Sequence, residues 1–197
     1  MNTQPTNPAV ETDSESSWFM DWLDGYNSIM QPLFKDLHAS LNGLNHVDHE
    51  YWRRVYIRSL FATIEADIYQ RKQLALMGHG KTHEFTDAEL GALRESQFSV
   101  QNNGTVTESV KFVPLAANYR LSFKLAAKVI ESRFELDCSG RDWQNFLECI
   151  NIRNRITHPK TGGDIVVTET DADLAKSVST WCAENMPAFL RAAKTDG

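Results

Sequence analysis

DHEYWRRVYIRSLFATIEADIYQRKQLALM, residues 48–77, carries the clearest structural signal of this chain. Apolar residues recur along it every three or four positions: Tyr56, Leu60, Phe61, Ile64, Ile68 and Leu74. This period indicates one long amphipathic helix with a single buried face. Gly78 and Gly80 follow directly and predict the end of the helix.

A second long helix is expected immediately before it, from Trp18 to about Leu44. Its apolar residues keep the same spacing, Ser17 can cap its start, and Gly43 lies near its end. Because only a few residues separate the two helices, we expect an antiparallel pair joined by a short turn.

Four further helices are expected downstream. A short one begins at Thr86, with Glu89 at capping-box spacing. Another runs from about Leu115 to Phe134. A third starts at Asp142 as its cap and stops at Pro159. The last runs from about Asp171 to Ala193, where Pro187 is expected to kink or split it.

One segment departs from the helical period. Phe98–Val100 and Val106–Val110 flank Asn102-Asn103-Gly104, and Asn-Gly between such runs is typical of a β-hairpin. The predicted fold class is therefore all-α, a helical bundle with a small hairpin insertion near residues 98–112.

The chain has 197 residues, which fits one domain. The polar residues 1–16, with Pro5 and Pro8, predict a disordered lead-in, and residues 17–197 the helical domain. No apolar run approaches membrane-spanning length and no signal-peptide pattern is present, so a cytoplasmic location without membrane contact is expected. Three widely spaced cysteines predict neither disulfides nor a zinc site.

The net charge of -6 disfavours broad nucleic-acid binding, but the charge is unevenly placed. Residues 1–50 hold eight acids and one base, a net of -7. Residues 111–160 hold nine Lys or Arg and five acids, a net of +4. A local contact with RNA is therefore possible in the second region.

That basic region contains Arg153-Asn154-Arg155-Ile156-Thr157-His158, followed by Pro159. RNA can be cut by its own 2′-OH, which requires proton transfer and a cation for the phosphorane. Histidine transfers protons near neutral pH, and arginine binds phosphate oxygens while keeping its charge. Asn154 and His158 share a helix face, whereas Arg153 lies about 140° from His158 around the axis. The motif therefore predicts half of a site, completed by a second copy of the chain.

These six residues resemble the R-x4-6-H signature of the HEPN superfamily, in its form with Asn after Arg. The helical arrangement from about Trp18 to Lys194 fits loosely as well. The resemblance implies a HEPN-like bundle that dimerises with its motif helices facing one another. It also implies a metal-independent endoribonuclease of a toxin–antitoxin, phage-defence or CRISPR system, with a possible antitoxin or defence-system partner protein. Arg153 and His158 would be catalytic, with Asn154 in support.

HEPN proteins often carry an acidic or polar residue near the motif on an earlier helix. Glu65 is our candidate, with Arg58 seven residues before it on the same helical face. One HEPN subgroup has Tyr two residues after the histidine. This chain has Lys160 there, which argues against a toxin silenced by modification of that tyrosine.

Four basic residues are candidates for RNA contacts: Arg155, Lys160, Arg120 and Lys124. Arg120, Lys124 and Lys128 recur every four residues, so they form either a rail for the RNA backbone or a solvated helix face. No cofactor or metal is expected, since the four histidines from His46 to His83 have no acidic partner at suitable spacing. Two alternatives remain: a non-catalytic HEPN-like protein- or nucleotide-binding module, and a helical scaffold in which Arg153 and His158 only satisfy buried polar groups.

Overall fold

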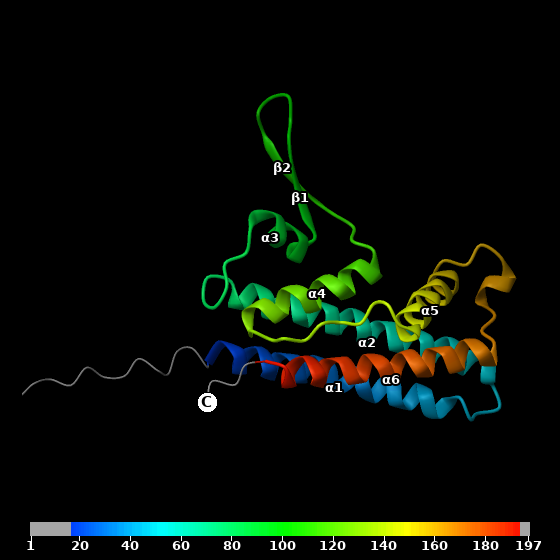
Figure 1. Cartoon of the computed structure of the whole chain (residues 1–197). Helices are drawn as coiled ribbons and strands as arrows, with labels where there is room; N and C mark the ends of the chain where they lie inside the picture. Colours follow the sequence, from blue (N-terminus) through cyan, green and yellow to red (C-terminus); the bar gives the residue numbers. More distant parts are fainter. Residues whose placement is uncertain (1–16, 194–197) are drawn as a thin grey trace, which may run out of the picture.

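Six α-helices and one β-hairpin make up the computed structural model, which describes residues 17–193 (Figure 1). In chain order the elements are α1 (Ser17–Gly43), α2 (His49–Gly78), α3 (Asp87–Arg94), β1 (Ser96–Val100), β2 (Val106–Val110), α4 (Leu115–Val129), α5 (Arg141–Thr157), the short 3-10 helix η1 (Gly162–Ile165) and α6 (Glu169–Arg191). The predicted all-α class with a hairpin insertion is confirmed. The predicted disordered segment, residues 1–16, lies outside the described residues.

Helices α1 and α2 form the predicted antiparallel pair (Figure 1). Trp22 and Met30 of α1 are buried against α2, and the Trp22 indole donates a hydrogen bond to the carbonyl of Gln70 at 2.8 Å. Asp48 caps α2 by accepting from the backbone N–H of Tyr51. The turn between the two helices is therefore fixed by a side-chain cap.

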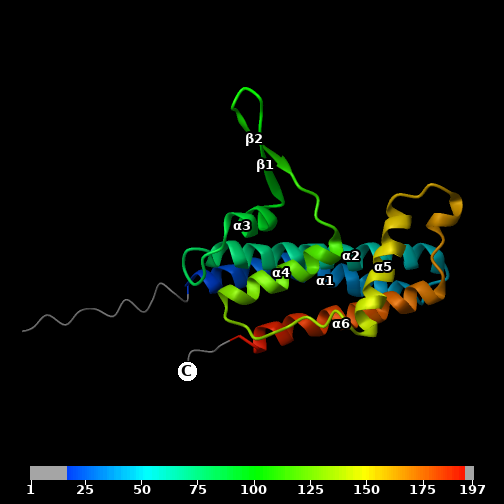
Figure 2. The same ribbon diagram turned by 45° about the horizontal axis from the view of Figure 1, so that its top comes forward.

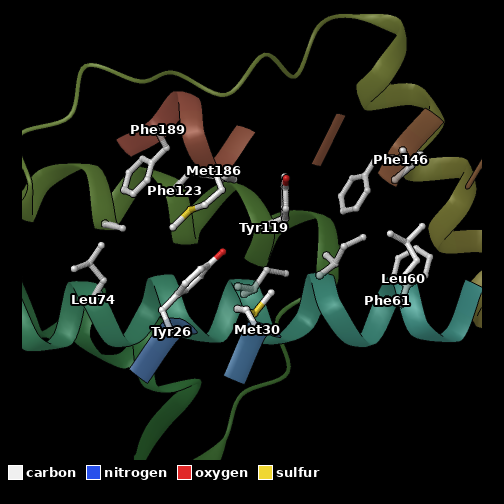
Figure 3. Packing of buried hydrophobic residues seen from close by; sticks show 14 of the residues in the cluster. Tyr26, Met30, Leu60, Phe61, Leu74, Tyr119, Phe123, Phe146, Met186 and Phe189 are labelled. Carbon is white, nitrogen blue, oxygen red and sulfur yellow. The ribbon is translucent and has the colours of Figure 1, made fainter. Parts of the chain in front are cut away.

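Helix α2 is the central element, because it contacts each of the other five helices. Figure 3 shows the core that it shares with its neighbours. The labelled side chains come from α1, α2, α4, α5 and α6: Tyr26, Met30, Leu60, Phe61, Leu74, Tyr119, Phe123, Phe146, Met186 and Phe189. The apolar period of residues 48–77 thus positions one continuous core.

A charged pair is buried inside this core. The guanidinium of Arg71 is fully buried, forms an ion pair with Asp67, and donates from Nε to Ser122 at 3.0 Å. It also lies 3.8 Å from the centroid of the Phe123 ring. Tyr26 donates its hydroxyl to Asp67 at 3.3 Å, and burial together with the Asp67 charge raises the pKa of Tyr26.

The predicted hairpin is present and projects away from the helices in both views (Figures 1 and 2). Strands β1 and β2 pair antiparallel, with Phe98 opposite Glu108 and Val100 opposite Val106. Gly104 in the connecting loop has a φ of +81°, a left-handed conformation that glycine adopts without strain. The Asn-Gly signal therefore predicted the turn correctly.

Two helix boundaries differ from the sequence prediction. Helix α4 ends at Val129 rather than near Phe134, and Glu131 takes a left-handed φ of +48°. Beyond it the chain is tied to α6, because the Ser132 hydroxyl donates to the carbonyl of Phe189 at 2.8 Å. Tertiary contacts therefore override the helical period here. The predicted Asp142 cap is also wrong, since Gly140 occupies the cap position and Asp142 lies inside α5.

Helix α6 is continuous from Glu169 to Arg191, so the predicted split at Pro187 does not occur. Met186 and Phe189 on either side of Pro187 are buried, and their packing holds the last turns in place. Within residues 17–193, no helix has the combination of length and apolar character needed to cross a membrane.

Candidate active site on helix α5

Helix α5 carries the motif residues and presents them away from the core. Its buried face packs against α2 and α6 and consists of Trp143, Phe146, Cys149, Ile152 and Ile156. Arg153 and Asn154 lie outside that face. The spacing of the apolar residues thus fixes the direction in which the polar ones point.

Glu65, Arg153 and Asn154 form one contiguous polar group. Arg153 forms an ion pair with Glu65 through Nη2 and donates from Nη1 to the Asn154 side-chain oxygen at 3.1 Å. A guanidinium has five N–H donors, so these two contacts leave donors for a phosphate oxygen. The contacts orient a cation that remains partly accessible to solvent.

Arg58 reaches the same region from α2. Its Nη2 donates to the main-chain carbonyl of Ile156 at 3.2 Å, one of the last carbonyls of α5. Arg58 and Glu65 are seven residues apart, which is about two helical turns on one face. Helix α2 therefore contacts the motif end of α5 at two points.

His158 lies at the C-terminal end of α5, as predicted from Pro159. Its backbone N–H donates to the carbonyl of Asn154 at 3.0 Å, and its side chain is exposed. Within residues 17–193 the imidazole makes no hydrogen bond, ion pair or ring contact. It is consequently available to another molecule.

A pocket of about 610 Å³ opens beside Arg153 and Asn154. Its lining comes from α2, α4 and α5, from Glu95 at the end of α3, and from the segment between β2 and α4. It includes the exposed rings of Tyr69 and Phe112. His158 does not line this pocket. One chain thus presents Arg153 at the pocket and His158 outside it.

The other polar end of this pocket is a group that the sequence did not reveal. The nearly buried ammonium of Lys72 lies 2.6 Å from Glu95, and the Asn118 side chain donates to the same carboxylate oxygen at 2.8 Å. Burial alone would raise the pKa of Glu95, but hydrogen bonds from Lys72 and Asn118 hold it below its usual value. The sequence did hold a signal for the burial of Lys72, though not for its partner, since Lys72 continues the four-residue apolar spacing of Ile64 and Ile68.

Arg155 has a structural role in this chain. Its guanidinium donates to the carbonyls of Asp164, at 3.0 Å, and Val166, and forms an ion pair with Asp171 at 2.6 Å. Predicted contact with RNA would compete with these bonds, which attach α5 to η1 and α6. Lys160 is exposed, and its backbone N–H donates to the Asp164 carboxylate at 2.9 Å.

Arg120 and Lys124 lie in a different place from the motif. They line a groove of about 910 Å³ between α4 and the segment that follows it, and none of its lining residues lines the Arg153 pocket. Arg120 lies 5.8 Å from the centroid of the Trp143 ring. The structure therefore separates the predicted basic rail from Arg153 and Asn154.

Metal-binding groups are not gathered in the described part of the chain. Residues 17–193 contain no group of three or more His, Cys, Asp or Glu side chains placed to hold an ion. Cys138, Cys149 and Cys182 are free thiols, and burial raises the pKa of Cys149 to about 12.

Comparison with known proteins gives no match: no family model, no curated protein and no solved structure aligns significantly with this chain. The motif and the contacts of its side chains are therefore the features that point to a function.

Proposed function

We propose that the protein is a metal-independent endoribonuclease that acts as a homodimer in a defence or toxin–antitoxin setting, as its resemblance to the HEPN superfamily implies. The observation that carries this proposal is the Glu65–Arg153–Asn154 group, which presents an oriented, partly accessible guanidinium beside a pocket. His158, whose side chain has no partner within residues 17–193, follows the last residue of the same helix.

The reaction assigns one role to each group. The RNA 2′-OH loses its proton and attacks the adjacent phosphorus, the bond to the 5′-oxygen breaks, and that oxygen gains a proton. The products are a 2′,3′-cyclic phosphate and a 5′-hydroxyl. His158 transfers the protons, and Arg153 stabilises the phosphorane charge through its remaining donors. Glu65 and Asn154 are positioning residues, since they hold the guanidinium of Arg153.

We infer that two copies act together, because His158 lies outside the pocket that Arg153 lines. In a two-fold dimer with facing α5 helices, the exposed His158 of one copy approaches Arg153 of the other. The exposure of His158 suits a group whose reaction partner belongs to a second chain. Lys160, two residues later and also exposed, would add positive charge next to the RNA.

The direct test incubates the purified protein with total RNA in EDTA and detects 2′,3′-cyclic phosphate ends. Cleavage should persist in EDTA and disappear in both Arg153→Ala and His158→Ala. Lys176→Ala removes an exposed cation on α6 and serves as the matched control that keeps activity. Circular dichroism verifies that every variant is folded.

A folded wild-type protein that cuts no RNA would overturn the proposal. If it bound RNA or nucleotides under those conditions, the non-catalytic binding module would be favoured instead. Cleavage abolished by EDTA would contradict the metal-free mechanism while leaving a nuclease.

A further inference from the structure

The pocket beside Arg153 has a second polar end, formed by Glu95 where α3 ends. One carboxylate oxygen of Glu95 accepts from Lys72 at 2.6 Å and from Asn118 at 2.8 Å. The other oxygen makes no hydrogen bond within residues 17–193. Burial raises the pKa of Glu95, but the hydrogen bonds from Lys72 and Asn118 keep it below its usual value. Glu95 is therefore ionised at neutral pH, and an ionised carboxylate only accepts hydrogen bonds.

Three residues of α2 line this pocket in a row. Glu65, Tyr69 and Lys72 are four and three residues apart, so they share one face of the helix. Glu65 holds Arg153 at one end of the row, and Lys72 holds Glu95 at the other. The helical rise separates the two ends by about 10 Å along the axis. That separation is close to the length of one nucleotide, from its phosphate to the Watson–Crick edge of its base.

Two aromatic rings offer surfaces on which a base can stack. Tyr69 comes from α2 and Phe112 from the segment between β2 and α4, and both line the pocket. Their side chains are 56% and 84% exposed. Stacking on such rings is a main source of affinity in the recognition of single-stranded RNA. The pocket volume of about 610 Å³ also falls in the range of small-molecule sites.

The carboxylate end distinguishes among the four bases. Lys72 is only 3% exposed and Glu95 is 38% exposed, so the carboxylate is the member of the pair that a ligand meets. Guanine has two adjacent donors at its Watson–Crick edge, N1–H and the N2 amino group, and the free oxygen of Glu95 has a lone pair for each. Adenine and cytosine have an acceptor next to their amino group, and uracil has its one donor between two acceptors. Each of these three bases would therefore set an acceptor against the negative charge.

We propose that the pocket binds a guanine nucleotide. The base stacks on Tyr69 and Phe112 and donates to Glu95. The phosphate accepts from the remaining donors of Arg153. In an RNA chain this guanosine is next to the bond that is cut, and that role rests on the proposed function. Binding of a free guanine nucleotide does not depend on cleavage.

Isothermal titration calorimetry of the full chain with the 3′-monophosphates of guanosine, adenosine, cytidine and uridine tests the site. Wild type should bind the guanosine nucleotide roughly 5–100-fold more tightly than the other three, the range that one well-placed base contact provides. Tyr69→Ala should raise the Kd of that nucleotide by roughly 5–100-fold, as the loss of base stacking does. Tyr51→Ala is the matched control and should leave the Kd unchanged, because Tyr51 is also exposed on α2 but does not line the pocket.

Glu95→Gln tests the base contact itself. It replaces an acceptor-only group by an amide that also donates, so the preference for guanosine over the other three nucleotides should disappear. The change also removes the counter-ion of the nearly buried Lys72. Circular dichroism therefore verifies that each variant is folded, and the wild-type and Tyr69→Ala measurements decide the question if Glu95→Gln does not fold.

Equal Kd values for the four nucleotides, or no binding of any of them at millimolar concentrations, would overturn the site. So would a Tyr69→Ala protein that binds as tightly as Tyr51→Ala. RNA cleavage measured on the same samples separates the two proposals. Selective binding of the guanosine nucleotide without any cleavage by wild type would support the site and refute the nuclease. Cleavage without selective binding would refute the site alone.

Discussion

Replacing Arg71 by Met should destabilise the protein strongly, because it leaves a carboxylate without its counter-ion inside the core. Arg71 is fully buried, and Asp67 is nearly so. Removing one member of a buried ion pair costs about 3–5 kcal/mol of unfolding free energy. For a chain of this size that corresponds to a Tm lower by roughly 6–20 °C.

The double variant Asp67→Asn/Arg71→Met should recover part of this loss. The charge that lacked a partner is gone, and the Asn oxygen can still accept from the Tyr26 hydroxyl. We therefore expect the double variant to be more stable than Arg71→Met alone, which is a strongly non-additive result.

Urea denaturation followed by circular dichroism measures these free energies. Arg54→Met is the matched control, because Arg54 forms an i,i+4 pair with the exposed Glu50 on the same helix, at 3.7 Å. It should cost less than about 1 kcal/mol, as exposed pairs do. An Arg71→Met loss as small as that of Arg54→Met would refute the account of the core.

Three further predictions concern packing, pH and the attachment of α5. Gly78→Ala should lower the free energy of unfolding, measured by urea denaturation, by about 1–3 kcal/mol, since the added Cβ would lie 2.6 Å from Cβ of Val129. A gain in stability would contradict this close approach. The hydrogen bond from Lys128 lowers the pKa of Glu89 from 4.5 to about 2. The ionised Glu89 therefore stabilises the folded protein fully above pH 4.5, and this contribution is lost as the pH falls through 2. Glu89→Gln should flatten the pH dependence of the unfolding free energy in that window, and an unchanged slope would count against the pair. Arg155→Ala should lower the unfolding free energy by about 1–3 kcal/mol; a neutral result would return Arg155 to the candidates for RNA binding.

Much of the fold was predictable because local signals agreed with the final packing. The apolar period of residues 48–77, the Thr86–Glu89 capping box and the Asn-Gly turn each specify a structure within a few residues. The end of α4 was not predictable in this way. It depends on Ser132, which contacts α6 nearly sixty residues later.

The candidate site likewise contains features that could be predicted from the sequence and features that could not. Glu65 could be named in advance as a residue near the motif, because the resemblance implies an acidic or polar side chain there on an earlier helix. Its ion pair with Arg153 is a finding of the structure. The contacts of Arg155 could not be predicted, since its partners belong to η1 and α6. The contact between Glu95 and Lys72 could not be predicted either, because Glu95 itself takes a left-handed conformation at the end of α3.

The central claim is that Arg153 and His158 act from two different copies. Mixing Arg153→Ala and His158→Ala proteins, each inactive alone, tests it most directly. Random exchange makes half of the dimers mixed, and each mixed dimer has one intact site of two, so cleavage should return to about a quarter of wild type. Activity that stays at the level of the separate variants, with exchange verified by labelled subunits, would contradict a site shared between two chains.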